Sequence, residues 1–149
     1  MANGREDPLL GFNFKLEVQD KVKGYFTEIG GLSSEHEIIE HKVVDQQGRD
    51  LILKIPGRLK WGDITLKRGI TSSMDVWDWR AEVEAGDMGA ARRNGSITMF
   101  DTTGAPKAKW DFTLGWPAKV SGPTFKADSN EFGIEELVIV HEGATRVKP

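Results

Sequence analysis

The chain has 149 residues, a formal net charge of −3 and no cysteine. This length fits one domain, and the charge gives no electrostatic reason to expect nucleic-acid recognition. The lack of cysteine excludes disulfides, thiolate metal sites and cysteine nucleophiles. A hydrophobic fraction of 38% together with 17 glycines predicts a β-rich domain with many turns and a modest core, of the kind that an oligomer completes.

The N-terminal segment 1–10 is polar and of mixed charge, so it lacks the apolar stretch of a signal peptide. No run of 18 apolar residues occurs, and we therefore expect no membrane-spanning helix and synthesis in the cytoplasm. Residues 1–149 are expected to form a single domain with short flexible ends, at about 1–7 and 146–149.

Alternation of apolar and polar residues predicts strands in the first half of the chain. The pattern is clearest at 12–18, where Phe12, Phe14, Leu16 and Val18 alternate with polar residues. After a turn at 20–24, further strands are expected at 25–29, 34–44, 51–55 and 64–70. Pro56 is expected to end the fourth of these five strands because proline cannot donate a ladder hydrogen bond.

One helix is expected from about Ser72, where 72–75 resembles a capping box. Val76 and Trp77 begin its apolar stripe, and Gly86 is expected to stop it. Trp79 lies about 200° further round the helix than Trp77. We therefore expect Trp77 in the core and Trp79 facing solvent or a partner.

The second half of the chain predicts a hairpin and a last strand. A strand around Ile97 is followed by a turn at 101–104 and a return strand. The return strand carries Trp110, Phe112, Leu114 and Trp116 at a spacing of two, which favours a core stripe over a sugar-binding platform. Pro117 is expected to limit that strand, and a last strand is expected at 132–141. Eight or nine strands plus one helix predict a mainly β sandwich or small barrel.

Neither a metal site nor a cofactor site is predicted. His36 and His41 are five residues apart and so point to opposite faces of a strand, and His141 beside Glu142 lacks the spacing of a helical zinc site.

No catalytic site is predicted either, so we expect no enzyme. Serine-elbow and phosphate-loop motifs are absent. Glu135 and Glu136 are adjacent, so they cannot act together as paired carboxylates on one strand face. The pair Arg92-Arg93 is more typical of a solvated turn than of a phosphate site.

The segment 34–44 has a different pattern, with the apolar couplets Ile38-Ile39 and Val43-Val44. Such a strand offers apolar side chains on both faces, as if neither faced plain solvent. This pattern predicts that one face of the segment contacts a neighbouring subunit.

Several short motifs follow one another along nearly the whole chain. They are Asp7-Pro8-Leu9, Gly30-Gly31-Leu32-Ser33, Pro56-Gly57, Leu66-Lys67-Arg68-Gly69, Trp77-Asp78-Trp79, Trp116-Pro117 and His141-Glu142-Gly143. In order and spacing the chain resembles the phage tail tube protein family, and more closely the inner tube proteins of extracellular contractile injection systems.

The resemblance implies a tail-tube (Hcp-like) fold, a β-sandwich or barrel with one flanking helix, that closes into a hexameric ring. Rings would stack into a rigid hollow tube that a sheath drives through a target envelope. Implied partners are further copies, the sheath protein, baseplate and tube-cap proteins, and protein cargo in the lumen. The implied particle is phage-like, assembled in the cytoplasm, and either released or active at the envelope.

Most candidate residues for the oligomer interface lie in the two-sided strand and the loop after it. The candidates are Glu35, Glu37, Ile39, His41, Val43, Gln46, Arg49, Arg68, Arg92 and Arg93. Two alternatives stay open: a ring-forming effector carrier of type VI secretion, which shares the fold, and a monomeric carbohydrate-binding β domain.

Overall fold

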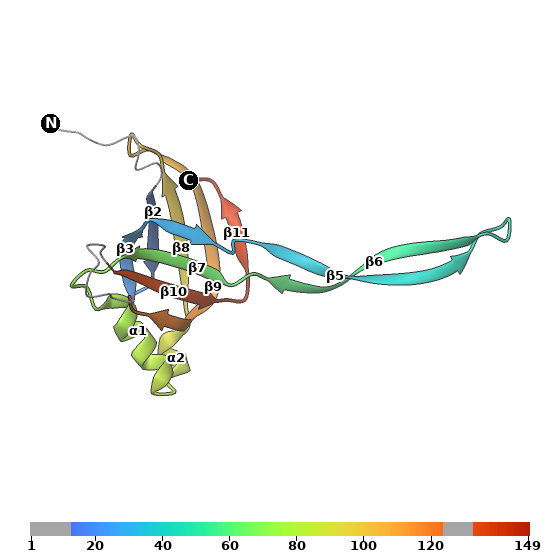
Figure 1. The fold of residues 1–149 in the computed structure, drawn as a ribbon. Helices are drawn as coiled ribbons and strands as arrows, with labels where there is room; N and C mark the ends of the chain where they lie inside the picture. The colour runs from blue at the N-terminus through green and yellow to red at the C-terminus, as the bar shows by residue number, and fades with distance from the viewer. Residues whose placement is uncertain (1–12, 124–132) are drawn as a thin grey trace, which may run out of the picture.

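A computed structural model describes residues 13–123 and 133–149, and these ranges contain ten strands and two helices. Figure 1 shows a rolled β body with both helices at one end and a long two-stranded arm projecting from its side. The elements are β2 (Asn13–Val18), β3 (Val22–Phe26), β4 (Glu28–Gly30), β5 (Ser34–Val44), β6 (Asp50–Trp61), β7 (Ile64–Gly69), α1 (Asp75–Glu84), α2 (Met88–Ala91), β8 (Arg93–Phe100), β9 (Pro106–Ser121), β10 (Ile134–Val140) and β11 (Ala144–Val147).

Strand β9 holds the body together by crossing from one layer of the sheet to the other. Its first half pairs with β8 and β11, and its second half pairs with β10. Leu114 lies between the halves with φ 49°, and the register with β8 shifts there. A bulge of this kind bends a strand and lets it turn a corner between packed sheets.

The run 22–30 closes the other side of the body in a similar way. Its first part, β3, pairs with β2, whereas its last part, β4, pairs with β7. The sheet order is therefore β3-β2-β8-β9-β10-β7-β4, and its two end strands, β3 and β4, follow each other in the sequence. The expected mainly β, sandwich- or barrel-like fold is confirmed.

The interior of this roll is filled by alternate residues of the strands and one face of α1. In β10, for example, Leu137 and Ile139 are buried, whereas Val138 between them is partly exposed. The core is made up of Leu16, Val18, Val22, Phe26, Ile64, Leu66, Val76, Trp79, Ile97, Phe112, Leu137 and Ile139.

Neither proline ends its strand as predicted. β6 continues through Pro56 to Trp61, and β9 continues through Pro117 to Ser121. In both cases the ladder shifts register close to the proline, opposite Ile38 in the first and Ile139 in the second. A missing N–H costs little at a bulge, because the ladder is already interrupted there.

The predicted stripe on β9 is broken at its centre. Phe112 is buried as expected, but Leu114 is 42% exposed and the two tryptophans are only partly buried. The cause is the positive φ of Leu114, which interrupts the alternation of the two strand faces.

The helix prediction was wrong about Trp79, which is only 1% exposed. The short helix α2, which was not predicted, folds back so that the Ala91 carbonyl accepts a hydrogen bond from Trp79 Nε1 at 2.7 Å. Trp77 packs at the edge of the core and donates from Nε1 to Glu135 Oε1 at 2.6 Å. The predicted stop at Gly86 agrees with its φ of 83°.

The C-terminal strand β11 was also not predicted. It pairs with the first half of β9, with Arg146 opposite Trp110 and Val147 opposite Lys109. Two residues of the end that was expected to be flexible thus take part in the sheet.

Helix α1 is fastened to the sheet by a buried cluster of charges around Arg68. The Arg68 guanidinium donates to Asp75 Oδ1 at 2.6 Å and to Glu135 Oε2 at 3.0 Å, and lies over the ring of Phe26. Arg68 and Glu135 are 6% and 3% exposed. Burial by itself lowers the pKa of Arg68, but the hydrogen bonds and charges of Asp75 and Glu135 outweigh it and raise that pKa.

We expect Arg68→Met to destabilise the fold by about 3–5 kcal/mol, because it leaves two carboxylates without their cation. The matched control is Lys67→Met, which removes the neighbouring, more exposed pair with Glu136 at 3.9 Å and should cost at most about 1 kcal/mol. Urea unfolding of both variants measures the difference. Equal losses would contradict the anchoring role of the buried cluster.

The β8–β9 turn supplies a prediction about pH. Asp101 Oδ1 accepts hydrogen bonds from Thr103 Oγ1 at 2.6 Å, Thr103 N at 2.9 Å and Ala105 N at 3.0 Å. The Thr103 hydroxyl, supported by the two amides and by Lys107, lowers the pKa of Asp101 to about 2.

A lowered pKa stabilises the fold above the ordinary value of 3.8, and the gain is lost as the pH falls through about 2. We therefore expect Asp101→Asn to lower the melting temperature at neutral pH, by a margin that shrinks between about pH 4 and pH 2. Calorimetry over this range tests it, and a margin independent of pH would refute it.

Candidate interaction surface

The arm, defined as β5, β6 and the turn between them (34–61), is the most unusual feature of the molecule. Almost every residue of both strands is exposed, and no other strand or helix of the described ranges packs extensively against them. Figure 1 shows the arm leaving the body beside β11 and extending well beyond it.

The local sequence explains why the segment forms a hairpin. The residues of β5 pair in antiparallel register with those of β6, from Ser34 opposite Trp61 to Val44 opposite Asp50. At the tip, Asp45 Oδ1 accepts hydrogen bonds from the amides of Gln47 at 2.9 Å and Arg49 at 2.8 Å. An aspartate that bonds the next amides in this way fixes a tight turn.

One side of the arm, the apolar face, carries apolar side chains from both strands. Directly opposed residues share a face, and side chains alternate along each strand. The register therefore places Ile39 beside Ile55, His41 beside Leu53 and Val43 beside Leu51. The apolar face consists of Ile39, His41, Val43, Leu51, Leu53 and Ile55. Its four Ile and Leu side chains are 43–52% exposed.

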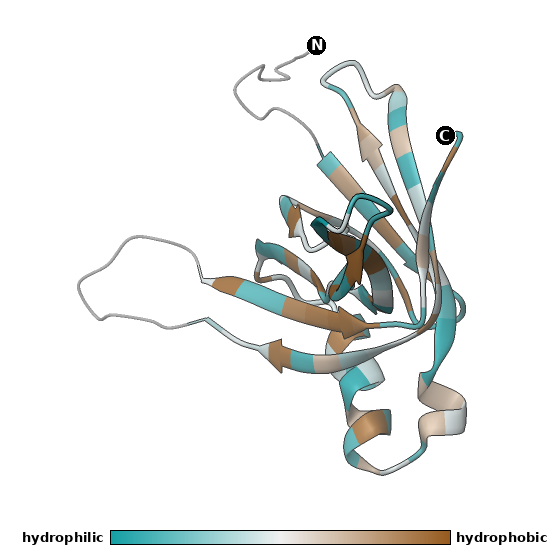
Figure 2. Ribbon diagram, turned by 90° about the vertical axis from the view of Figure 1, so that its right-hand side faces the viewer, coloured by the Kyte–Doolittle hydropathy of each residue, from teal (hydrophilic) through white to brown (hydrophobic). Residues whose placement is uncertain are grey.

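The opposite side of the arm is mixed. Glu40 lies opposite Lys54, and Lys42 lies opposite Ile52. Ile38 and Val44 on this side are also exposed, but charged residues separate them. Figure 2 looks at the molecule from the side of the arm, which therefore points toward the viewer, and shows hydrophobic and hydrophilic segments alternating along strands of the body.

An exposed ribbon with an apolar face is expected to bind a partner. An isolated two-stranded ribbon is at best marginally stable in water, and a contiguous exposed apolar patch usually marks an interaction site. Each arm strand also has one edge without a strand partner in the described ranges, where another chain can pair. The arm is therefore the candidate interaction surface.

Seven of the ten interface residues predicted from the sequence lie on the arm. Glu35, Glu37, Ile39, His41 and Val43 share one side of the arm, and Gln46 and Arg49 lie in its tip. Near the root of the same side, Glu37 pairs with Lys60 at 3.1 Å.

Three of the predicted interface residues lie off the arm. Arg68 is buried in the charge cluster of the isolated chain, where it offers little surface to a neighbouring copy. Arg92 and Arg93 lie next to α2, where the Arg93 guanidinium donates to the carbonyls of Gly89 and Arg92. The exposure of Arg92 agrees with a solvated turn.

Half of the apolar face was not predicted from the sequence. Leu51, Leu53 and Ile55 come from β6, and their alternation was visible in the sequence. A spacing of two signals a strand with one apolar face, but it does not say whether that face meets the core or a partner.

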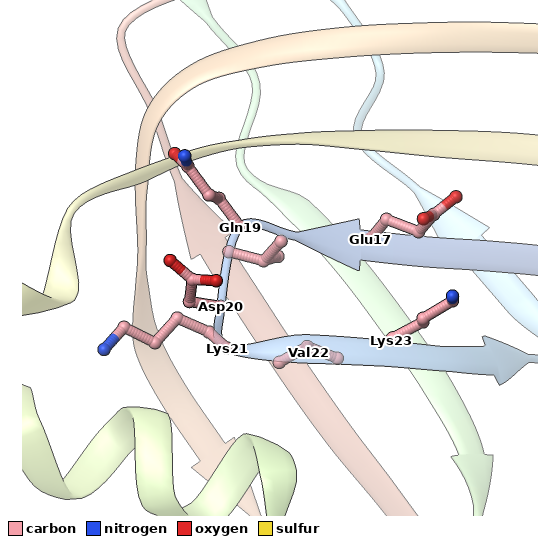
Figure 3. Close-up of a pocket in the computed structure, with 7 residues that line it drawn as sticks. Glu17, Gln19, Asp20, Lys21, Val22 and Lys23 are labelled. Carbon is pink, nitrogen blue, oxygen red and sulfur yellow. The ribbon is translucent and has the colours of Figure 1, made fainter.

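Within 13–123 and 133–149, no cluster of three or more histidine, cysteine or acidic residues is arranged to hold a metal ion. None of the described helices has the length and apolar character needed to cross a membrane. Figure 3 shows a shallow hollow around the β2–β3 turn, lined by residues 17–23. Its Lys21 is already paired with Glu82 of α1 at 2.9 Å.

Comparison with solved structures places this fold among tube and secretion proteins. A chain of the PVC sheath-tube complex of an extracellular contractile injection system superposes with a TM-score of 0.74 and 22% identity, covering 90% of this chain and 87% of that chain. A chain of the anti-feeding prophage cap gives 0.70 and 20%, covering 100% and 95%. Hcp1 from Flavobacterium johnsoniae gives 0.54 and 16%, covering 89% and 93%.

The family comparison covers most of the sequence. Comparison with curated proteins gives no match. The model of the T4-like virus tail tube protein gp19 family, however, matches residues 10–145, which include the whole arm and nearly all of the β body. The chain therefore belongs to the family of the T4-like virus tail tube protein gp19, a family of structural proteins rather than enzymes.

Proposed function

We propose that six copies of this chain form a ring, that rings stack into a rigid hollow tube, and that copies join through their arms. The observation that carries the proposal is the apolar face, which no part of the described chain covers. Membership of a tail tube family supports it from a separate direction. The mechanism is mechanical, since the chain supplies a stiff conduit and no reaction.

Head-to-tail contacts between identical subunits account for both levels of the assembly. A rotation that closes gives a ring, and a translation along the ring axis gives a stack. If each subunit contributes about four strands, six subunits make a barrel of about 24 strands, wide enough for an aqueous channel. Such closure would also give the exposed strand edges a partner.

The similar solved structures suggest the partners of the tube. They come from a sheath-tube complex, a sheath/tube terminator, a tube cap and a baseplate. By analogy, we propose that the tube assembles in the cytoplasm within a sheath, is bounded by a baseplate and a cap, and carries protein cargo in an extracellular contractile injection particle.

The two alternatives have less support. Hcp proteins share the fold, but the Hcp structures compared give TM-scores of 0.52 to 0.54, against 0.68 to 0.74 for the injection-system chains. Binding of a carbohydrate through tryptophan needs tryptophan rings that are exposed. All five tryptophans are buried or only partly exposed in the isolated chain.

We expect the purified chain to form rings and stacked tubes with a central channel, visible by electron microscopy. A population of single chains at high concentration would contradict the proposal. Rings that never stack, even at high concentration, would favour the type VI secretion carrier instead.

Two neighbouring isoleucines allow a sharp test of the apolar face. Ile39→Glu places a charge within the apolar face, whereas Ile38→Glu places the same charge on the mixed side, at a residue that is 67% exposed. Burying an isoleucine contributes about 1.5–3 kcal/mol, and about 1.4 kcal/mol corresponds to tenfold in affinity. We therefore expect Ile39→Glu to raise the concentration needed for assembly by about tenfold or more, and Ile38→Glu to have a much smaller effect.

Sedimentation measures assembly, and far-ultraviolet circular dichroism checks that both variants keep their β structure. The proposal fails for this face if Ile39→Glu assembles like the parent chain, or if the two variants lose assembly equally.

A further inference from the structure

At the root of the arm, the backbone of residues 31–33 lies directly against that of residues 62–63. Gly62 donates its amide to the Ser33 carbonyl at 2.9 Å, and Ser33 donates to the Gly31 carbonyl at 2.8 Å. Gly31 has φ 85°, and a Cβ on it would overlap the Asp63 carbonyl. A Cβ on Gly62 would overlap the Ser33 side chain. The two segments touch without side chains between them, so the packing around them sets the direction of the arm.

His141, at the end of β10, binds this root to the body. Its Nε2 lies 3.0 Å from the Gly62 carbonyl oxygen, and its Nδ1 accepts a hydrogen bond from the Gly143 amide at 3.1 Å. An amide N–H can only donate, so Nδ1 must be without a proton and Nε2 must carry one. The structure therefore uses the neutral ring in a single tautomer.

The same ring also touches the arm and the core through aromatic contacts. The rings of Trp61 and Phe112 lie 6.0 Å and 6.2 Å from it, centre to centre. Gly143 also faces the Trp61 ring, since a Cβ built on it would be 3.5 Å from Cζ2. One imidazole thus joins the last residues of β6, the turn before β11 and the core.

No charged group contacts this imidazole in the described ranges. The charged neighbours in the adjoining segments are Lys60, Asp63, Asp111 and Glu142. Lys60 pairs with Glu37, and the three carboxylates are exposed and form no hydrogen bond with the ring. A proton on Nδ1 would place an N–H against the Gly143 N–H, and so would remove the hydrogen bond that orients the ring toward the Gly62 carbonyl.

We propose that neutral His141 is a positioning residue that locks the root of the arm, and that protonation of its Nδ1 releases the arm into a wider range of directions. Histidine ordinarily gains a proton between about pH 7 and pH 5. The lock itself concerns a single chain. Its consequence for the tube, weaker assembly in acid, rests on the proposed function of the arm.

Because the chain has no cysteine, the arm can be labelled at chosen sites. Spin labels on Gln46→Cys in the tip and Thr102→Cys in the body report the spread of tip-to-body distances by electron–electron double resonance, with labelled chains diluted in unlabelled chains. We expect the distribution to be at least about twice as wide at pH 5 as at pH 7.5. His141→Gln, which cannot titrate, should give the same width at both pH values.

One of the other histidines supplies a matched control, since His36 lies on the arm outside the apolar face and is exposed. The variant His36→Gln should keep the full pH response. An unchanged width in the parent chain, or a response that survives in His141→Gln, overturns the lock. Should His141→Gln fail to fold, nitrogen NMR of the parent decides the matter: a proton on Nε2 at pH 7.5 and a loss of the Gly143 amide bond at pH 5 support it, and a proton on Nδ1 at pH 7.5 overturns it.

Sedimentation of the same samples separates the two proposals. Widening of the distances at pH 5 with loss of assembly supports both the lock and the arm as the joint between copies. Widening with unchanged assembly supports the lock and overturns the proposed role of the arm.

Discussion

A two-stranded ribbon has no interior, and the molecule is organised around this constraint. The arm has apolar side chains on one face and backbone edges without strand partners, and the described part of the body covers neither. Burying isoleucine, leucine and valine side chains yields free energy only when another surface excludes water from them. The part of the chain that looks least stable in isolation is thus the part with the most to gain from identical neighbours.

The body gives this arm a rigid base. Strand β9 ties the two layers together at the corner formed by Leu114, and the run 22–30 ties them at the opposite side. The buried guanidinium of Arg68 fixes α1 to β7 and β10 through two carboxylates. Charges that are buried and mutually satisfied tolerate little displacement, because any movement leaves one of them unpaired. Such a body suits a conduit that must keep its shape under load.

The root of the arm is where these two parts meet, and its chemistry differs from both. Close backbone packing at Gly31 and Gly62 allows the chain to leave the body, while the His141 ring fills the corner with directed hydrogen bonds. Apolar packing tolerates small rotations, whereas a hydrogen bond weakens quickly when its geometry changes. Polar contacts therefore hold the direction of the arm at its root, whereas the proposed contact between arms would draw its affinity from apolar area.

The β class of the fold, the bounds of the arm strand 34–44 and its two-sided apolar pattern follow from the sequence alone, because period-two alternation is a local property of the chain. The likeness to tail tube proteins was also visible in the order of short motifs. The three-dimensional fold was needed to show that Arg68 is buried, that α2 covers Trp79, that Pro56 and Pro117 lie within strands, and that His141 contacts Gly62. These facts depend on which residues distant in the sequence become neighbours, and on bulges that shift a strand by one residue. The local spacing of residues predicts neither the distant neighbours nor the bulges.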